Sequence, residues 1–322
     1  MIKVENLTKA FGPKLAVNDV SFSVERGEVL GFLGPNGAGK STSMRMLTGF
    51  IPPTAGRISI GGFDMLVNPI PAKRLMGYLP ENAPSYSDMT VEGFLKFCAE
   101  VRGLSRDERK RAVGGAIEAC FLEPVMYQTV DTLSKGYRHR TCLAQSIIHD
   151  PDVLVMDEPT DGLDPNQKHE IRTLIRRMGA TKAIIFSTHI LEEVEEACTR
   201  AIIIDRGRIV ANGTPDELKR RSANAGAVSI TIPGGVPDAV KAKLGGIDNA
   251  ASVEVLSESP LRVRVRPKVQ GAGLARAVVE AASAERWQFD DIHTEEGRLD
   301  EVFRTITQPD HLKAGATGEA RA

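Results

Sequence analysis

The sequence has few cysteines, few aromatic residues and no long hydrophobic run. Four of its 322 residues are cysteine, widely separated and without a Cys-x-x-Cys pair, and 5% are aromatic. Scattered cysteines in helix-like stretches favour buried thiols in a reducing cytoplasm over disulfides or metal ligands. No apolar run reaches the roughly 18 residues that cross a bilayer, and the N-terminus lacks the apolar core of a signal peptide. We therefore expect a cytoplasmic protein that has no membrane span of its own.

An excess of one charge is also missing. The chain has 41 Lys and Arg against 42 Asp and Glu, a formal net charge of −1. Proteins whose main task is non-specific nucleic-acid binding usually carry a basic excess, so we expect no nucleic-acid partner. Charged residues make up 26% and hydrophobic residues 42%, which is ordinary for a globular protein with one large domain and one small one.

A glycine-rich octapeptide, Gly34–Ser41, is the most informative segment that is present. It follows the apolar run Val29–Leu33 and precedes a helix-like run, which is the strand–loop–helix context of a phosphate-binding loop. The glycines let backbone N–H groups surround an anion, Lys40 reaches the β- and γ-phosphates, and the Ser41 hydroxyl completes a Mg²⁺ shell. The predicted ATP-binding residues here are Gly34, Pro35, Asn36, Gly37, Ala38, Gly39, Lys40, Ser41 and Thr42.

A second motif supplies two carboxylates. The apolar run Val153–Met156 predicts a buried strand that ends at Asp157 and Glu158. Asp157 is placed to hold Mg²⁺, and Glu158 to polarise the attacking water. The alternative is a solvated acidic loop, which the four apolar residues before the pair disfavour. The sequence therefore predicts phosphoryl transfer, with ATP and Mg²⁺ as cofactors.

Three further segments give only weak evidence for a function when each is taken alone. Ser134 and Gly136 at a helix start form a small anion site or an ordinary cap. Asp161–Asp164 is typical of a turn. His189 ends a buried strand, where it donates a hydrogen bond to a γ-phosphate or has a structural role. The order of all five segments along the chain favours the functional interpretation.

Residues 1–221 alternate short strands with helices, which predicts an α/β domain with a helical insertion at about 85–150. The predicted strands are Ile2–Leu7, Val20–Val24, Val29–Leu33, Arg57–Ile60, Val153–Met156, Ala183–Phe186 and Ala201–Ile204. The predicted helices are Ser41–Thr48, Val91–Val101, Arg106–Phe121, Tyr137–Ile148, Gln167–Met178 and Leu191–Cys198.

A small α+β domain is predicted over residues 227–307, after a linker at 222–226. The predicted elements follow the β-α-β-β-α-β order of the ferredoxin-like arrangement, and a last helix covers Leu299–Phe303. The predicted strands are Val228–Ile232, Ser252–Leu256, Leu261–Arg266 and Trp287–Thr294, and the predicted helices are Pro237–Leu244 and Gly273–Ala284. Residues 308–322, rich in Ala and Gly, are expected to be disordered.

In this order, the motifs of residues 1 to about 220 closely resemble the nucleotide-binding subunit of ATP-binding cassette (ABC) transporters, a P-loop NTPase family. The matched segments are Walker A at Gly34–Ser41, the signature at Leu133–Tyr137, Walker B at Val153–Asp157, the catalytic Glu158, the D-loop at Asp161–Asp164 and the switch His189.

The resemblance also implies roles for residues outside these motifs. Phe11 matches the aromatic residue that stacks on adenine, and Val17 would line the same pocket; a core position is the alternative for Phe11. Glu81 stands where the family has the Q-loop glutamine. As a carboxylate, Glu81 is expected to bind Mg²⁺ or to order water.

The signature departs from the usual Leu-Ser-Gly-Gly-Gln at two positions, Lys135 and Tyr137. Ser134 and Gly136, which face phosphate in the family, remain. The resemblance implies that Ser134, Lys135, Gly136 and Tyr137 contact the ATP of a partner subunit.

By this resemblance, the chain is an ATPase subunit that pairs with itself or a homologue and docks on separate integral membrane permeases at the cytoplasmic face. The small C-terminal domain and Leu299–Phe303 resemble exporter-type (ABC-2) subunits, including the gliding-motility and copper-site-maturation (Gld/Nos) group. The alternatives are a non-transport ABC ATPase acting on ribosomes or DNA, and a membrane-linked mechanical or regulatory ATPase. The C-terminal domain is either a dimerisation prop or a sensor.

Overall fold

The computed structural model describes residues 1–82, 84–271 and 273–307, so the tail predicted to be disordered at 308–322 lies outside the described residues. The chain divides into two compact units, Met1–Pro215 (unit 1) and Asp216–Ala322 (unit 2). The sequence placed this boundary a few residues later, at 221. Each unit is described by itself below.

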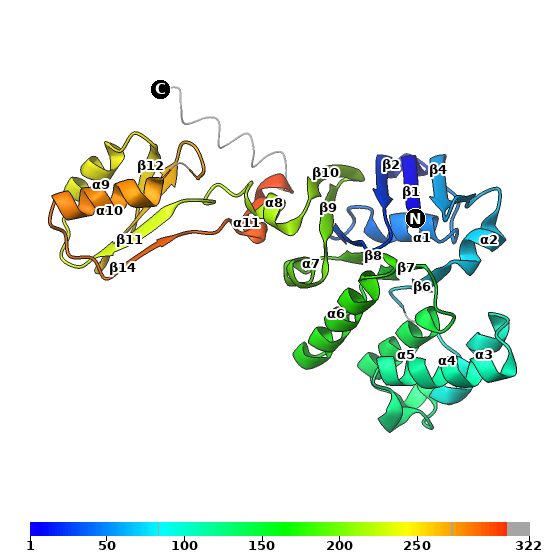
Figure 1. The fold of residues 1–322 in the computed structure, drawn as a ribbon. Coiled ribbons are helices and arrows are strands. Elements are labelled where there is room, and N and C mark those ends of the chain that lie inside the picture. The colour runs from blue at the N-terminus through cyan, green and yellow to red at the C-terminus, as the bar shows by residue number, and fades with distance from the viewer. Residues whose placement is uncertain (83, 272, 308–322) are drawn as a thin grey trace. The chain divides into compact units, whose positions relative to one another are not determined.

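Unit 1 contains a mostly parallel sheet with the strand order β10-β9-β3-β8-β7-β6 (Figure 1). Strand β10 alone among these runs antiparallel to its neighbour. Every residue of β3, β7 and β8 is buried, as is typical of strands covered on both faces. The strands are β3 (Val29–Leu33), β6 (Met76–Leu79), β7 (Val153–Asp157), β8 (Ala183–Thr188), β9 (Arg200–Asp205) and β10 (Arg208–Gly213).

A second, antiparallel sheet of unit 1 has the order β2-β1-β4-β5. Its strands are β1 (Ile2–Phe11), β2 (Lys14–Val24), β4 (Ala55–Ile60) and β5 (Phe63–Asp64). Helix α1 (Lys40–Leu47) shares one hydrophobic core with both sheets, which includes Phe32, Met44 and Ile58. The phosphate-binding loop is therefore fixed at both of its ends by buried elements.

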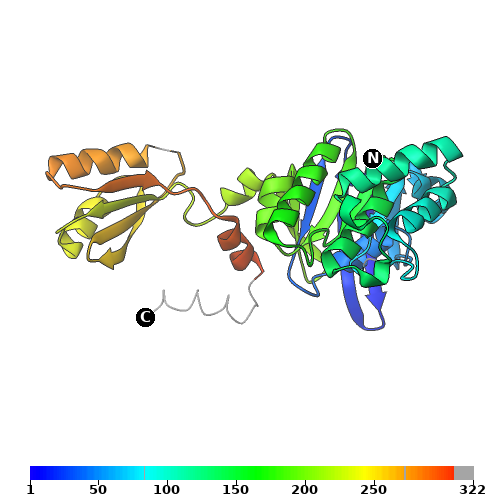
Figure 2. The ribbon, with the colours of Figure 1, turned by 90° about the horizontal axis from the view of Figure 1, so that it is seen from below.

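Three helices form the predicted insertion, and Figures 1 and 2 show them gathered at one side of unit 1. They are α3 (Val91–Val101), α4 (Arg106–Ala119) and α5 (Lys135–Ile147), with short 3₁₀ helices at Glu123–Val125 and Val130–Thr132. Thr90 caps α3 by accepting a hydrogen bond from the Gly93 N–H at 3.1 Å. The other helices of unit 1 are α2 (Pro69–Arg74), α6 (Pro165–Gly179) and α7 (Leu191–Ala197).

Unit 2 has an antiparallel sheet with the order β12-β13-β11-β14. Helices α9 and α10 cover one face of it, and the element order matches the predicted ferredoxin-like arrangement (Figure 1). The elements are β11 (Val228–Ile232), α9 (Pro237–Gly245), β12 (Ala250–Glu258), β13 (Leu261–Pro267), α10 (Leu274–Ala284), β14 (Asp291–Thr294) and α11 (Leu299–Ile306). Helix α8 (Pro215–Lys219) spans the boundary between the units.

The structure differs from the predicted elements in several places. The last strand starts at Asp291 rather than Trp287, because the Trp287 N–H closes the end of α10 on the Ala282 carbonyl at 2.9 Å. Strand β6 was not predicted: it has only four residues, and its Gly77 lies so close to α5 that a Cβ would meet the Ser146 carbonyl oxygen at 2.0 Å. The sequence also did not predict β5, β10, α2 or α8.

The described residues bear on two expectations from composition. None of their helices has the length and hydropathy that crossing a bilayer requires. All four cysteines are free thiols; Cys120 and Cys142 are buried, and burial raises the pKa of each thiol to about 12.

Candidate active site

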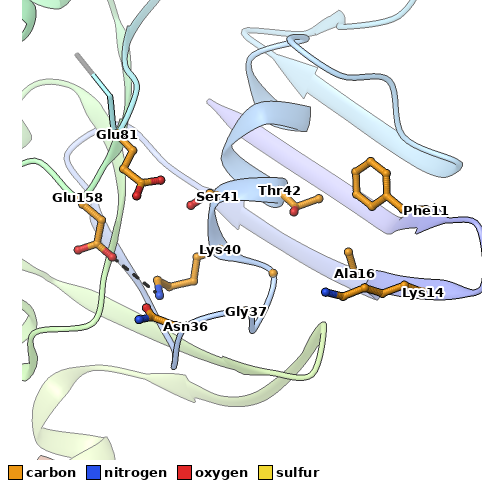
Figure 3. Close-up of a pocket in the computed structure, with 11 residues that line it drawn as sticks. Phe11, Lys14, Ala16, Asn36, Gly37, Lys40, Ser41, Thr42, Glu81 and Glu158 are labelled. Atoms are coloured by element: carbon orange, nitrogen blue, oxygen red, sulfur yellow. Dashed lines mark ion pairs between the residues drawn. The ribbon is translucent and has the colours of Figure 1, made fainter. Parts of the chain in front are cut away.

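A pocket of about 540 Å³ lies beside the glycine-rich loop. In Figure 3, the carboxylates of Glu81 and Glu158 lie at one end, Phe11 at the other, and Lys40 and Ser41 between them. The pocket therefore has an acidic end and an aromatic end. Its lining residues are Phe11, Lys14, Ala16, Asn36, Gly37, Gly39, Lys40, Ser41, Thr42, Glu81 and Glu158.

The loop needs glycine at two positions where neighbouring backbone atoms lie too close for a Cβ. A Cβ at Gly34 would lie 2.4 Å from the Ile204 carbonyl oxygen, and one at Gly39 would lie 2.5 Å from the Ala16 carbonyl oxygen. Gly39 also has a φ of 110°, which side chains rarely tolerate. Helix α1 starts here without a side-chain cap, so its first N–H groups are left for an anion.

Lys40 is a buried cation at the centre of the pocket. Its side chain is 6% exposed, and Nζ donates to the Gly34 carbonyl at 2.8 Å and lies 3.8 Å from Glu158 Oε1. Burial lowers the pKa of Lys40, and the nearby carboxylates of Glu158 and Asp157 oppose that shift. A buried ammonium with acceptors on one side is suited to bind a polyanion.

Asp157 ends β7 and is 1% exposed. Its Oδ1 accepts hydrogen bonds from Ser41 Oγ at 3.2 Å and from Ser187 Oγ. Its Oδ2 is buried and has no hydrogen-bond partner among the described residues. A buried carboxylate oxygen without a partner is unfavourable, and oxygen ligands of this kind are those that Mg²⁺ takes. The donor set of Ser41 and Asp157 therefore fits a Mg²⁺ ion.

Glu158 has an unusual backbone conformation. Its φ of 52° lies in the left-handed region, which costs a non-glycine residue about 1–3 kcal/mol. Its N–H donates to the Ser187 carbonyl at 3.2 Å, and His189 Nδ1 lies 2.9 Å from Oε2. Burial raises the pKa of Glu158, while His189 and Lys40 pull it down. A carboxylate with a raised pKa accepts a proton more readily near neutral pH.

The aromatic end differs from the prediction at one residue. Phe11 lines the pocket with half of its surface exposed, and Lys9 Nζ lies 5.1 Å from its ring centroid. Val17, which was predicted to line the pocket, is fully buried in the core. Side chains alternate along β2, so Ala16 rather than Val17 faces the pocket, together with Lys14.

The signature and D-loop residues do not line this pocket. Ser134 caps α5 by accepting from the Tyr137 N–H at 3.3 Å, and Asp164 caps α6 by accepting from the Gln167 N–H at 2.9 Å. Lys135 and Asp161 instead line a separate cavity of about 430 Å³, which Glu81 shares. Gly136 is buried, and the Arg140 guanidinium lies 5.7 Å from the Tyr137 ring centroid.

Two comparisons decide the family. Residues 17–161 match the family described as ABC transporter. Over 308 residues, the chain is 30% identical to the linearmycin resistance ATP-binding protein LnrL of Bacillus subtilis (strain 168), covering 95% of this chain and 98% of that protein. The chain belongs to the ABC transporter family. This ABC subunit is also 36% identical to the Nod factor export ATP-binding protein I of Burkholderia orbicola (strain AU 1054), over 82% of this chain and 89% of that one.

A solved structure of an ATP-binding subunit of an ABC transporter matches the ABC subunit with a TM-score of 0.64 and 32% identity. The match covers 69% of this chain and 92% of that chain. The predicted fold class, a P-loop NTPase of the ABC type, is confirmed. The predicted function and activity, those of an ATP-binding and ATP-hydrolysing subunit of an ABC transporter, are confirmed as well.

Some site residues were not predicted from the sequence. Lys14 and Ala16 lie three and five positions after Phe11, on the strand that returns along β1. Ser187, which bonds Asp157, falls inside the segment that ends at His189 but was given no role. The hairpin β1–β2 and the pairing of β7 with β8 carry these contacts, so only the strand pairing reveals them.

Proposed function

We propose that the chain powers export through separate membrane permease subunits, with ATP bound in the pocket of Figure 3. The observation that carries this proposal is the convergence of Lys40, Ser41 and Glu158 on one pocket beside the glycine-rich loop, with the buried Asp157 bonded to Ser41. The triphosphate would lie on the loop, and Phe11 would stack on the adenine at the other end.

The proposed chemistry uses these residues in distinct roles. Lys40 Nζ would turn from the Gly34 carbonyl to the β- and γ-phosphate oxygens. Glu158, oriented by His189, would take a proton from water as the water oxygen bonds to the γ-phosphorus. The bond to the bridging oxygen then breaks, leaving ADP and phosphate. When bound to Ser41, Asp157 and Glu81, Mg²⁺ would supply neutralisation of the phosphate charge.

A second copy or a homologue is proposed to complete the site. The signature residues Ser134 and Gly136 lie at the start of α5 and do not line the ATP pocket of their own chain. Their hydroxyl and helix start would therefore bind the γ-phosphate held by a partner, with the D-loop residues Asp161 and Asp164 nearby. ATP would then join two subunits and hydrolysis would release them.

The proposed permease contact lies on the helical side of unit 1. A cavity of about 730 Å³ is lined by exposed apolar side chains, including Ile70 and Val101, and by the cations Lys73 and Arg102. We propose that the loop before α3 also contacts the membrane partner; the ring of its Tyr86 packs edge-on against Phe97, with ring centroids 5.4 Å apart. The alternative for this loop is a packed surface without a partner.

Export is supported by the relatives' printed names, which refer to linearmycin resistance and to Nod factor export. The ferredoxin-like unit 2 and the Leu299–Phe303 segment in α11 support the ABC-2 and Gld/Nos subtype. We place the chain at the cytoplasmic face of the membrane, bound to its permease, and assign unit 2 to dimer support.

The substitution Glu158→Gln tests the activity. It keeps the side-chain size but removes the base, so hydrolysis should slow about a hundredfold while ATP binding persists. The exposed Glu258→Gln in unit 2 is the matched control and should hydrolyse ATP at the parent rate. Hydrolysis by Glu158→Gln at the parent rate would overturn the proposal.

The transport claim needs a separate experiment, because a non-transport ATPase would give the same hydrolysis. The protein should co-purify with a multi-spanning membrane protein, and the pair should move cargo in an ATP-dependent flux assay. Co-purification without any flux would favour the mechanical or regulatory alternative. Co-purification with ribosomes or DNA instead would favour the non-transport ATPase.

A further inference from the structure

Two side chains on one face of α5 reach the turn that follows Glu158. Lys135 Nζ lies 2.7 Å from Asp161 Oδ2. His139 is 3% exposed; burial lowers the pKa of its ring, and the nearby Asp161 carboxylate and the Pro159 backbone act to raise it. Its Nε2 has no hydrogen-bond partner among the described residues. Residues four apart lie on the same side of a helix, so these two contacts act together on one turn.

This turn needs support because Glu158 has a left-handed backbone. Ser187 accepts the Glu158 N–H, and the Thr160 hydroxyl bonds the Glu193 carboxylate. From α5, Lys135 and His139 make further contacts with the same turn. An unfavourable conformation persists only when its surroundings fix it from several directions.

Lys135 contacts the turn through its aliphatic stem as well as through its ion pair. Its side chain is 69% exposed and that of Asp161 is 44% exposed, so the ion pair contributes little to stability. However, its stem lies across Gly162, where a Cβ would come within 2.6 Å of Lys135 Cδ. Gly162 has a φ of 75°, so the turn and the lysine stem fit only when glycine is present.

We propose that Lys135 and His139 are positioning residues, which hold the turn at Pro159 and Asp161 and thereby orient the Glu158 carboxylate. This inference rests on the proposed role of Glu158. Neither residue lines the ATP pocket of its own chain, so within one subunit each acts on Glu158 through the turn.

The lysine is tested with a double-mutant cycle in the full chain. Lys135→Met and Asp161→Asn should each lower kcat about 10- to 100-fold, as expected for a misplaced catalytic group. The double variant should be no slower than either single variant, because both changes remove the same contact. If the two effects multiply, Lys135 acts elsewhere, for example directly on ATP, and this part of the inference is wrong.

The histidine is tested by loss and rescue. His139→Leu should lower kcat by a similar factor with unchanged KM for ATP, whereas His139→Gln, which keeps an N–H donor, should restore most of it. His169→Leu, at an exposed position of α6, is the matched control. Equal defects in the Leu and Gln variants, or none in either, would contradict the role of His139.

The Glu158→Gln variant, measured in parallel, separates the two failures. If it is slow while the α5 variants match the parent, the positioning role is wrong and the proposed function stands. If it hydrolyses ATP at the parent rate, the proposed function itself is wrong. Thermal unfolding and ATP affinity of each variant identify any that lose activity by misfolding.

Discussion

Unit 1 and unit 2 place their charged residues differently. In unit 1, Lys40 and Asp157 are 6% and 1% exposed and lie at one end of a sheet buried on both faces. In unit 2, Arg264 and Arg266 pair with Glu254 on the face of the sheet that the helices leave open. Burying charge costs several kcal/mol per ion unless partners repay it. The buried charges of unit 1 lie where ATP is proposed to react.

The carboxylates of the two units show the same contrast. Burial raises the pKa of Glu158 in unit 1. Burial also acts to raise the pKa of Glu295 in unit 2, but hydrogen bonds from Arg264 and Ser229 outweigh it and lower that pKa. Glu295 therefore favours its charged form and stabilises the fold, whereas Glu158 is poised to accept a proton.

The largest effect is expected for the buried cation of unit 1, because the contrast between the units requires that this cation is needed for ATP binding. Lys40→Ala should weaken ATP binding by about 3–6 kcal/mol, the value of two charge-assisted hydrogen bonds. Lys243→Ala, half-exposed in unit 2, should leave binding unchanged. Titration of fluorescent ATP measures both, and an unchanged affinity for Lys40→Ala would contradict the assignment of the loop.

Core substitutions test whether the two units unfold independently. Ile185→Ala in β8 and Ile230→Ala in β11 each empty a fully buried site, which should cost about 2–5 kcal/mol of unfolding free energy. The single tryptophan, Trp287, lies in unit 2, so its fluorescence follows unit 2 while ATPase activity follows unit 1. Only Ile230→Ala should shift the tryptophan transition. Equal shifts from both variants would show that the units unfold together.

The opposite pKa directions predict a pH effect. Because the pKa of Glu158 is raised, kcat should fall with decreasing pH at a midpoint above the ordinary glutamate pKa of about 4.3. Glu158→Gln should lack this limb. The stability from Glu295 is full above the unfolded pKa and is lost as pH falls through the lowered folded pKa, below the ordinary glutamate value. A kcat limb that persists in Glu158→Gln would refute the first part.

The smallest effect is expected for an ion pair of unit 2. Arg276→Met removes the contact with Glu280 at 2.8 Å, and exposed pairs of this kind contribute little to stability. Denaturation followed by Trp287 fluorescence should show that small change, with ATPase activity unaltered. A loss of several kcal/mol would show that the charges of unit 2 matter as much as those of unit 1.

Strands and motifs that are defined by a short stretch of sequence were predicted well. The continuous apolar runs gave β3, β7 and β8, and the loop and carboxylate motifs placed Lys40, Asp157 and Glu158 next to one another. Strand β10 was missed because its Arg-Ile-Val-Ala-Asn-Gly sequence lacks a buried run, and pairing with β9 decides its conformation.

Contacts between distant segments could not be predicted from the sequence patterns. The choice of Ala16 over Val17 depends on which face of β2 meets the loop. The contacts of Lys135 and His139 join residues twenty or more positions apart, and they depend on how α5 packs against the turn after β7. No spacing rule relates those positions.

The central claim is that the ATP pocket of one chain is completed by the start of α5 of another. Light scattering of Glu158→Gln with ATP tests it most directly, because bound ATP is not consumed. The account predicts that the mass doubles in ATP but not in ADP, and that adding Ser134→Arg abolishes the doubling. A mass that stays that of one chain in ATP, or pairing that survives Ser134→Arg, would contradict it.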